Sequence, residues 1–361
     1  MNLEHLYYQI IDKERKFYHA PLFFIFRFLA IFYRGLHRLR LLAYRFGLFK
    51  SRRLAGRVIS VGNLTLGGTG KTPMTLMIAE ILRGHGYKPA ILSRGYGGNS
   101  AQEINVVCDG KHVLLPPELV GDEPVMMAKK LKNVPILTGP NRYKTGRHAL
   151  EQLGADTLIL DDGFQHLALA RDLNILLFDH QNPFGNGYLF PAGNLREPLN
   201  EARRADLICI MNHTGKGGST EIEQIVPSGI PIIKTSLRLD SIIHLDSGEV
   251  QESDYLQGQP VAVFCGIAKP DAFEKMLERV QAHVVLFRPF PDHHSYTAHD
   301  LKTLEMDAKS AGAKFLLTTE KDAVKLKGHA FGLPAMKVVI ELEITEGREI
   351  LTQRLLNHIP G

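Results

Sequence analysis

Three observations predict an α/β fold with two domains. Short apolar runs alternate with segments of helical spacing from 58–61 to 231–235, a pattern typical of a parallel sheet covered by helices on both faces. At 361 residues the chain is too long for one typical core. A stretch of alternating polarity with a central turn, 236–257, predicts a β-hairpin linker between a first domain, 51–235, and a smaller second α/β domain, 258–361.

The first 50 residues, 1–50, form a separate segment that is basic and apolar. No Asp or Glu lies between Arg15 and Ala79, so this part of the chain is expected to face an anionic partner. Its apolar run, 21–33, is interrupted by Arg27 and as a helix would reach roughly 20 Å, less than the thickness of a hydrocarbon core. We therefore expect a membrane-associated helix that lies in the interface rather than one that spans the bilayer.

The arginines of this segment separate that interpretation from two others. As a helix, the segment places Arg27, Arg34, Arg38 and Arg45 on one line, with phenylalanines and leucines over much of the remaining surface. A basic helix on a nucleic acid is disfavoured by so many phenylalanines, and a buried core helix by four arginines. The segment predicts an anionic membrane surface as partner and no nucleic acid.

A glycine-rich loop, 62–72, follows the apolar run 58–61 and opens a segment of helical spacing. In such a loop, backbone N–H groups converge on phosphate oxygens, a helix N-terminus adds partial positive charge, and a lysine, here Lys71, reaches the outer phosphates. Thr72 would offer its hydroxyl to Mg²⁺. The loop departs from the usual G-x-x-x-x-G-K-S/T pattern because Thr65 takes the first position, and the alternative is a strand-to-helix turn with a surface lysine. The loop residues expected to hold phosphate are Gly67, Gly68, Thr69 and Gly70.

Polar residues follow other apolar runs, at the sheet edge where nucleotides bind. The run 157–160 ends in Asp161 and Asp162, and P-loop enzymes place a carboxylate there beside phosphate-bound Mg²⁺. The alternative for this pair is a helix cap. Two further tails, 93–98 and 138–142, also carry groups suited to phosphate. The first domain is therefore predicted to be P-loop NTPase-like.

Two other clusters carry titratable groups. Asp122 lies in the polar turn 121–124, where it is either a routine helix N-cap or the acceptor of a proton from an attacking hydroxyl. In the second domain, Asp292 is followed by His293 and His294. These histidines could bind metal, could be solvated, or could orient a general base.

The spacing of the cysteines argues against two kinds of cysteine site. Cys108, Cys209 and Cys265 lie far apart with no C-x-x-C pair, so neither a disulfide framework nor a thiolate zinc site is expected. This favours a reducing compartment.

Several longer motifs occur in one order along the chain. They are VGNLTLGGTGKTP at 61–73, SRGYGG at 93–98, GDEP at 121–124, DDGFQH at 161–166, PAGNLREP at 191–198, DHH at 292–294 and TTEKD at 318–322. Together they resemble the tetraacyldisaccharide 4′-kinases of lipid A biosynthesis over nearly the full length. The resemblance implies transfer of the γ-phosphate of ATP to the 4′-hydroxyl of a tetraacylated glucosamine disaccharide 1-phosphate, giving lipid IVA. It also implies action at the cytoplasmic face of the bacterial inner membrane.

The resemblance further implies roles for individual residues. Lys71 and the backbone of 67–70 would hold the β- and γ-phosphates of ATP. Thr72 and the pair Asp161 and Asp162 would serve Mg²⁺.

The same resemblance makes Asp122 the general base, with a histidine partner that is His293 first and His294 second. Arg142 would stabilise charge on the transferring phosphoryl group. A base and a partner on different domains would require closure about the hairpin linker. The residues expected to line the substrate cleft are Glu123, Gln165, His166, Glu197 and Arg94.

Two other functions compete with this one. A membrane-recruited regulatory ATPase or GTPase would share the glycine loop and the acid pair. However, Leu66 stands where such proteins need a signature lysine, and the guanine-reading N-K-x-D motif is absent. A nucleic-acid-binding NTPase gains little from a helix rich in phenylalanine.

Overall fold

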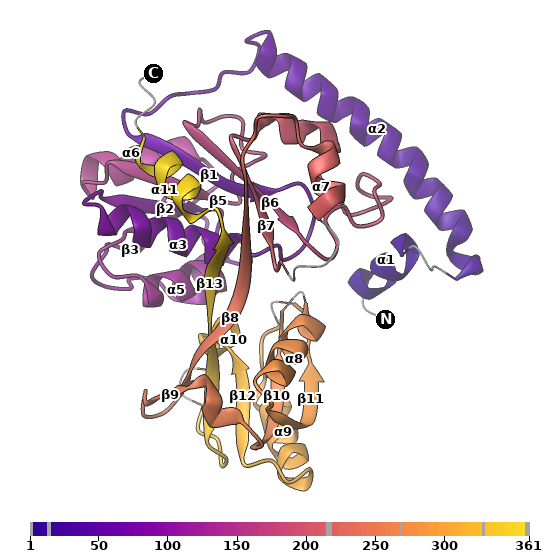
Figure 1. Cartoon of the computed structure of the whole chain (residues 1–361), viewed down its shortest axis with the longest axis vertical. Helices are drawn as coiled ribbons and strands as arrows, with labels where there is room; N and C mark the ends of the chain where they lie inside the picture. Colours follow the sequence, from indigo (N-terminus) through magenta and orange to yellow (C-terminus); the bar gives the residue numbers. More distant parts are fainter. Residues whose placement is uncertain are drawn as a thin grey trace. The chain divides into compact units, whose positions relative to one another are not determined.

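The chain folds into two compact units, each assembled from segments that are separate in the sequence. Figure 1 draws the whole chain, coloured along the sequence. The first unit comprises Met1–Pro89, Arg142–Ser236 and Ile344–Gly361, and the second comprises Ala90–Asn141 and Leu237–Glu343. The structure is a computed structural model that describes residues 3–12, 16–213, 219–267, 269–292, 294–326 and 329–357. The domain limits expected from the sequence, 51–235 and 258–361, stay predictions.

A parallel sheet forms the centre of the first unit. Strand β1 (Arg57–Asn63) lies between β5 (Thr157–Asp161) and β6 (Leu173–Asp179) and runs parallel to both. β7 (Leu207–Met211) pairs with β6, and the first residues of β8 (Ile232–His244) pair with β7 in the same direction. Nearly every residue of β1, β5, β6 and β7 is buried, as parallel strands covered on both faces should be. The parallel sheet predicted from the sequence is confirmed.

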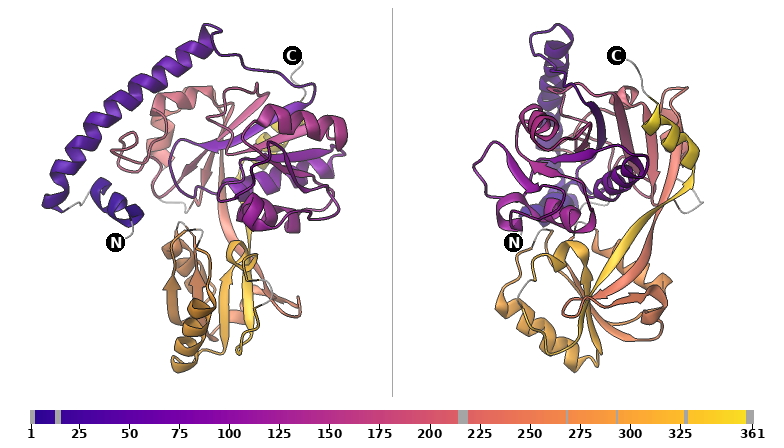
Figure 2. Two further views of the ribbon diagram at one scale, coloured as in Figure 1. Left: turned by 180° about the vertical axis from the view of Figure 1, so that it is seen from behind. Right: turned by 90° about the vertical axis from the view of Figure 1, so that its left-hand side faces the viewer.

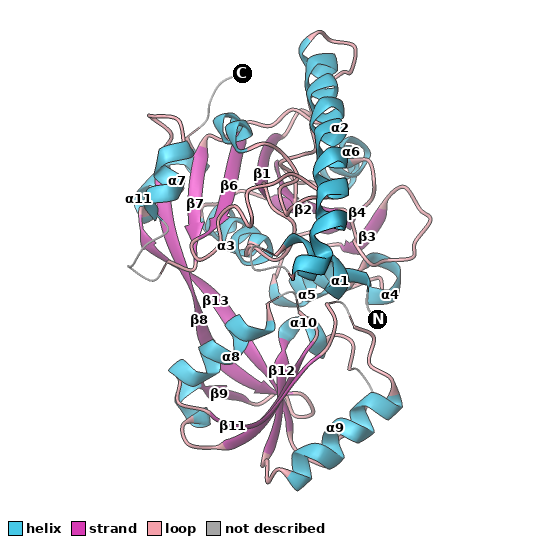
Figure 3. Ribbon diagram, turned by 90° about the vertical axis from the view of Figure 1, so that its right-hand side faces the viewer, coloured by secondary structure: helices cyan, strands magenta, loops and turns pink. Residues whose placement is uncertain are grey.

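The helices of the first unit cover this sheet (Figure 3). α3 (Lys71–Gly84) contacts β1 and β5, and it also packs against α11 (Arg348–Leu356) near the C-terminus. α6 (Arg142–Gln152) packs on β5, while α7 (Ser219–Ile225) packs on the 3-10 segment η2 (Leu199–Arg204). Apolar side chains from β6, β7 and the segments that follow β1 and β5 form one core, which includes Leu64, Phe164, Leu176, Phe178, Ile208 and Ile210.

The N-terminal segment of the first unit is helical. α1 (Leu3–Ile11) and the short 3-10 segment η1 (Phe17–His19) precede α2 (Ala20–Arg45), a single long helix (Figure 2). Phe23, Ala30 and His37, spaced by seven residues, are the buried residues of α2, so one narrow stripe of the helix faces the protein. Phe23 and Ala30 pack with Ile10 and Ala192.

The rest of α2 is exposed and strongly apolar. Phe24, Phe28 and Ile31 expose 63%, 61% and 68% of their surfaces. Within the part of the chain that the structure describes, Phe17–Arg45 is the one segment long and apolar enough to cross a membrane by length and composition. The sequence predicted that this segment does not span a membrane, because its apolar run is short. The helix that contains the run is longer: α2 has 26 residues and extends about 39 Å.

The second unit holds two groups of strands. In the first, β2 (Pro89–Ser93) pairs in parallel with β4 (Ile136–Thr138), and β4 pairs antiparallel with β3 (Asn105–Cys108). The helices α4 (Pro117–Val120) and α5 (Asp122–Lys130) follow β3, and α5 packs on β3 and β4.

The second group of strands is parallel. β10 (Pro260–Cys265) lies between β11 (His283–Pro289) and β12 (Phe315–Thr319), and β12 pairs with β13 (Ala335–Glu346). α8 (Pro270–Arg279) and α9 (Ala298–Ser310) connect these strands, and α9 begins with a Thr297–Asp300 capping box. The short helix α10 (Glu320–Ala323) follows β12 and contacts α5.

The hairpin expected over 236–257 is present. β8 pairs antiparallel with β9 (Val250–Glu252), with Ile242 opposite Gln251, and the 3-10 segment η3 (Ser253–Leu256) follows. β8 and β13 each have residues in both units. The role of the hairpin as a hinge stays a prediction.

Candidate active site

The glycine loop joins β1 to α3 in the first unit. Gly67 and Gly70 have φ values of 96° and 81°, a region that residues with a Cβ rarely adopt, and Gly70 is the N-cap of α3. Helix α3 therefore begins at Lys71, and its unpaired N–H groups and partial positive charge are presented at the loop. The loop lies between a strand and a helix, which is the context that phosphate binding requires.

Lys71 is held at the end of β1 by polar contacts. Its Nζ donates to Asn63 Oδ1 at 3.3 Å and lies 3.6 Å from Asp162 Oδ1. The amide of Asn63 also donates to the hydroxyl of Thr69, which is 4% exposed. Asn63 thus connects the lysine to the loop, and the sequence motifs gave it no role.

The acid pair lies at the end of β5, as the sequence predicted: Asp161 is the last residue of the strand and Asp162 follows it. Asp161 is buried and accepts a hydrogen bond from the Thr75 hydroxyl of α3 at 3.3 Å. Asp162 accepts two hydrogen bonds from Arg196 Nη1, at 2.8 and 2.9 Å. Burial alone would raise the pKa of Asp162, but the charges of Lys71 and Arg196 outweigh it and hold the pKa below its ordinary value.

Two arginines stand near this pair. Arg142 is buried at the start of α6, and its charge also lowers the pKa of Asp162. Arg196 was part of a motif in the sequence but had no role assigned to it. The structure therefore brings Lys71, Asp162 and Arg142 into one region of the first unit.

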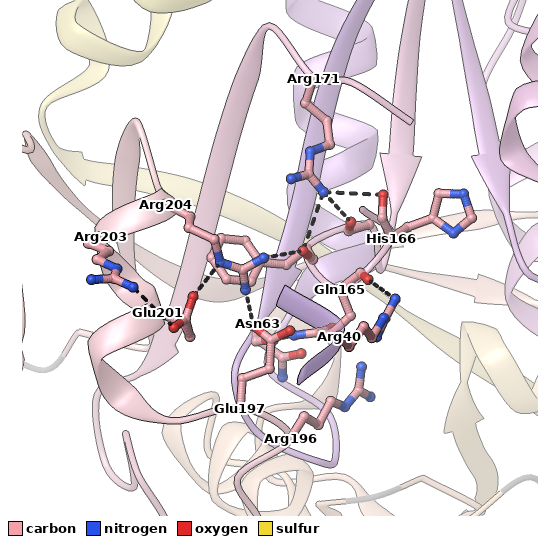
Figure 4. Close-up of polar contacts among 12 residues, drawn as sticks. Arg40, Asn63, Gln165, His166, Arg171, Arg196, Glu197, Glu201, Arg203 and Arg204 are labelled. Atoms are coloured by element: carbon pink, nitrogen blue, oxygen red, sulfur yellow. Dashed lines mark hydrogen bonds and ion pairs between the residues drawn. The ribbon is translucent and has the colours of Figure 1, made fainter. Parts of the chain in front are cut away.

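Arginine side chains donate hydrogen bonds to the backbone carbonyls of the loop that contains Gln165 and His166 (Figure 4). Arg171 Nη1 donates to the carbonyl oxygens of Gly163, Phe164 and His166 at 3.3–3.5 Å, and Arg40 of α2 donates to the Gln165 carbonyl at 2.9 Å. The side chain of Gln165 donates to the carbonyl of Asn63 at 2.9 Å. These contacts join the loop after β5 to the end of β1.

Glu197 is buried in an ionic cluster rather than exposed (Figure 4). Its carboxylate pairs with Arg204, which also pairs with Glu201 and lies over the Phe164 ring, 4.4 Å from the centroid. Burial raises the pKa of Glu197 to about 7, although the guanidinium of Arg204 opposes the shift. Whether Glu197 contacts substrate stays a prediction.

Asp122 lies in the second unit as the first residue of α5. The N-cap is Gly121, and no side chain caps the helix, so the interpretation of Asp122 as an N-cap is wrong. Its carboxylate Oδ2 lies 3.1 Å from Nζ of Lys325, a residue that the sequence motifs did not include. An acid in the first turn of a helix is stabilised in its charged form by the helix dipole.

A neighbouring lysine binds the acid next to Asp122. Lys321 Nζ lies 3.4 Å from Glu123 Oε1 and 3.1 Å from Asp292 Oδ1. Burial alone would lower the pKa of Lys321, but these two carboxylates outweigh it and raise the pKa. The TTEKD motif thus supplies a lysine that joins α5 to the Asp-His-His loop.

The histidines expected beside Asp122 have different outcomes. His293 lies outside the described residues. His294 Nε2 lies 3.2 Å from Asp300 Oδ2, and its ring stacks on Phe290 with centroids 4.7 Å apart. The ring of His294 is therefore engaged with α9 and with Phe290.

The SRGYGG segment is explained by packing. A Cβ on Gly121 would lie 2.4 Å from the Tyr96 carbonyl oxygen, and one on Gly98 would lie 2.5 Å from that of Leu119. Close backbone contact between 93–98 and the turn before α5 therefore needs glycine on both sides. Arg94, expected to line a cleft, is the second residue of this segment and is exposed.

A family model described as tetraacyldisaccharide-1-P 4′-kinase matches residues 22–360. The chain belongs to this family. The resemblance inferred from the motifs is confirmed, and it extends from α2 to the C-terminal helix α11.

Individual members of the 4′-kinase family match over most of their length. The tetraacyldisaccharide 4′-kinase of Syntrophus aciditrophicus is 44% identical over 337 residues, which cover 90% of each chain. That of Geobacter sulfurreducens is 44% identical over 314 residues and 87% of each chain. Among solved structures, the apo form of LpxK from Aquifex aeolicus in complex with ATP has a TM-score of 0.73 and 34% identity. The match covers 91% of this chain and 96% of that one.

Proposed function

We infer that this chain is a tetraacyldisaccharide 4′-kinase that transfers the γ-phosphate of ATP to the 4′-hydroxyl of a tetraacylated disaccharide 1-phosphate in lipid A biosynthesis. The observation that carries this conclusion is the family match over residues 22–360. It is supported by a glycine loop that leads directly into α3, with Lys71 as the first residue of the helix. ATP as phosphate donor is supported by the relative from Aquifex aeolicus, which was solved with ATP. The acceptor is a lipid disaccharide phosphate, and the product is lipid IVA.

In the first unit, the glycine loop binds the phosphates of ATP. The N–H groups of Gly67, Gly68, Thr69 and Gly70 and the start of α3 face phosphate oxygens, and Lys71 neutralises charge on the β- and γ-phosphates. Arg142 stabilises the charge that spreads over the transferring phosphoryl group. Because Asp162 is ionised and bound to Arg196, the charges around Lys71 are fixed before nucleotide arrives.

The acid pair suits Mg²⁺. Hydroxyl and carboxylate oxygens are the ligands that this ion prefers, and one or two carboxylates suffice because phosphate oxygens and waters complete its shell. Asp161 and Asp162 supply such oxygens at the end of β5, and Thr72 supplies one from the first turn of α3. The ion would neutralise charge on the β- and γ-phosphates.

In the second unit, Asp122 acts as general base toward the 4′-hydroxyl. A base must be ionised before the reaction, and the first turn of α5 and the ammonium of Lys325 both favour the ionised carboxylate. Glu123 is held by Lys321 beside it. His293 stays the proposed histidine partner, with His294 second. Gln165, His166, Glu197 and Arg94 stay candidates for contacts to substrate.

Helix α2 binds the protein to the cytoplasmic face of the bacterial inner membrane. Its exposed apolar residues suit the acyl region of an interface, and its arginines suit anionic headgroups, which are enriched in the cytoplasmic leaflet. Arg27 lies over the ring of Tyr188 at 5.3 Å, so one of the four aligned arginines also packs on the protein. No nucleic acid partner is proposed.

The direct test is phosphate transfer from radiolabelled ATP to the acylated disaccharide, followed by separation of lipid from nucleotide. Wild type should place label in the lipid. Asp122→Asn should lower kcat about 10²- to 10⁴-fold because the amide cannot accept the proton. Full activity of Asp122→Asn would remove the base assignment, and absence of label with wild type would remove the kinase assignment.

Membrane binding is tested by sedimentation with anionic phospholipid vesicles. The pair Phe28→Asp and Ile31→Asp should release the protein from vesicles, since both side chains lie on the exposed face of α2. Leu114→Asp is the matched control, because Leu114 is 52% exposed in the second unit and lies outside this helix. Equal sedimentation of all variants would contradict the assignment of α2.

A further inference from the structure

The ammonium group of Lys325 occupies the centre of a cluster of acceptors in the second unit. Its Nζ lies 3.1 Å from Asp122 Oδ2, 3.4 Å from Asp322 Oδ1 and 3.1 Å from the carbonyl oxygen of His294. A lysine ammonium has three donors, so each donor has one acceptor. The side chain is only 10% exposed, and these contacts are shielded from solvent.

The lysine is itself fixed by a rigid partner. Asp322 is fully buried and accepts hydrogen bonds from the Gly266 N–H at 2.9 Å and the Thr319 hydroxyl at 2.7 Å. Asp322 lies in α10, at the end of β12, whereas Gly266 follows β10. The position of Lys325 is thus set by the ends of two central strands, and Lys325 in turn sets the position of Asp122.

The charges explain why a cation is needed at this point. Asp122 and Asp322 are two carboxylates that share one ammonium, and without it their like charges would repel each other in a buried site. A protonated Asp122 could not accept a proton from a hydroxyl. An ammonium within hydrogen-bonding distance removes this penalty and favours the charged carboxylate.

Among the described residues, other charged or titratable groups near Asp122 come from three elements. They are Glu123 on α5, Lys321 and Asp322 on α10, and Asp292 and Tyr296 on the loop after β11. Burial raises the pKa of Tyr296, and the carboxylates of Asp322 and Asp122 raise it further, so the phenol stays neutral. Lys321 is bound to Glu123 and Asp292. The positive charge of Lys325 directly contacts Asp122.

We propose that Lys325 is a positioning residue that keeps the carboxylate of Asp122 ionised and aimed, and that ties it to the Asp-His-His loop through the His294 carbonyl. The proposal rests on the assignment of Asp122 as the general base. The residue acts through Asp122 and need not contact ATP or lipid.

The test is the pH dependence of kcat/KM for phosphate transfer by the full-length protein. Lys325→Met and Lys325→Gln should move the acidic limb of the profile upward by about one pH unit or more, because Asp122 then loses its ammonium partner. Activity below the limb should fall about tenfold or more. Lys325→Arg keeps the charge and should restore the limb toward its wild-type position.

A matched control separates this effect from loss of structure. Lys130 Nζ also joins α5 to α10, through Glu320 at 2.7 Å, and to β13, through the Ile340 carbonyl at 3.0 Å, yet it lies two turns from Asp122. Lys130→Met should lower the thermal unfolding temperature as Lys325→Met does, while the acidic limb stays in its wild-type position. Unfolding temperatures are measured for all variants.

The outcomes distinguish this inference from the assignment on which it rests. If Asp122→Asn is inactive but both neutral variants of Lys325 keep the wild-type limb, the role of Lys325 is overturned and the base remains. If Asp122→Asn keeps its activity, the base assignment itself fails. In the Asp122→Asn background, Lys325→Met should have little further effect on the remaining rate, and a full additional loss would show that the lysine acts elsewhere.

Discussion

The glycine loop around Lys71 and the helix start around Asp122 are built by different means. The loop is local: its glycines, lysine and threonine are adjacent in the sequence, and Asn63, eight residues before Lys71, holds the lysine. The helix start depends on distant residues, because Asp122 is held by Lys325 and Glu123 by Lys321. The proposed phosphate-binding loop is thus formed by one continuous segment, whereas presenting a carboxylate at the start of α5 depends on folding of the whole second unit.

A large effect is expected at the local site. Lys71→Met removes the charge that is proposed to face the outer phosphates while leaving the glycine loop intact, and should lower kcat about 10²- to 10³-fold. Lys111→Met, at an exposed lysine, is the control. The rate of phosphate transfer is measured for both. A wild-type rate for Lys71→Met would show that this loop is not the nucleotide site. The contrast between a locally built nucleotide site and a helix start held by distant residues would then no longer hold.

A smaller effect is expected at the helix start, through the backbone. Gly121 has a φ of 91° and stands against the Tyr96 carbonyl, so Gly121→Ala should force the turn before α5 to move and cost about 1–3 kcal/mol of unfolding free energy. Gly84→Ala, at the end of α3 where a Cβ meets nothing, should be neutral or stabilising. Urea unfolding measures both. Equal stability of the two variants would mean that the turn before α5 adapts, and that it does not fix Asp122.

The smallest expected effect concerns Glu197 in the first unit. Its pKa is raised to about 7, so the folded protein keeps this proton to higher pH than the unfolded chain. Its contribution to stability is complete below about pH 4.5 and is lost as the pH rises through about 7. Glu197→Gln cannot ionise, so its stability relative to wild type should rise by about 2 kcal/mol between pH 5 and pH 8. Thermal unfolding at the two pH values measures this, and a difference that does not change with pH would show that Glu197 is already ionised at pH 5.

The sequence predicts most of the local features and few of the tertiary ones. The strands β1, β5, β6 and β7 and the glycine loop follow from apolar runs and turn residues, because these signals lie within a few positions of one another. The hydrogen bond between the side chains of His294 and Asp300 could not be predicted, since it depends on where α9 begins. The pairing of Asp122 with Lys325 joins residues about 200 positions apart, and only the register of packed elements brings them together.

The exposed face of α2 has a practical consequence for work with the purified protein. Phe24, Phe28 and Ile31 lie on α2 outside its narrow buried stripe. In buffer without detergent, these side chains are therefore exposed to water. Contiguous apolar surface of this kind promotes self-association. Preparations without detergent should therefore contain aggregates, and mild detergent should return them to a single dispersed species in gel filtration.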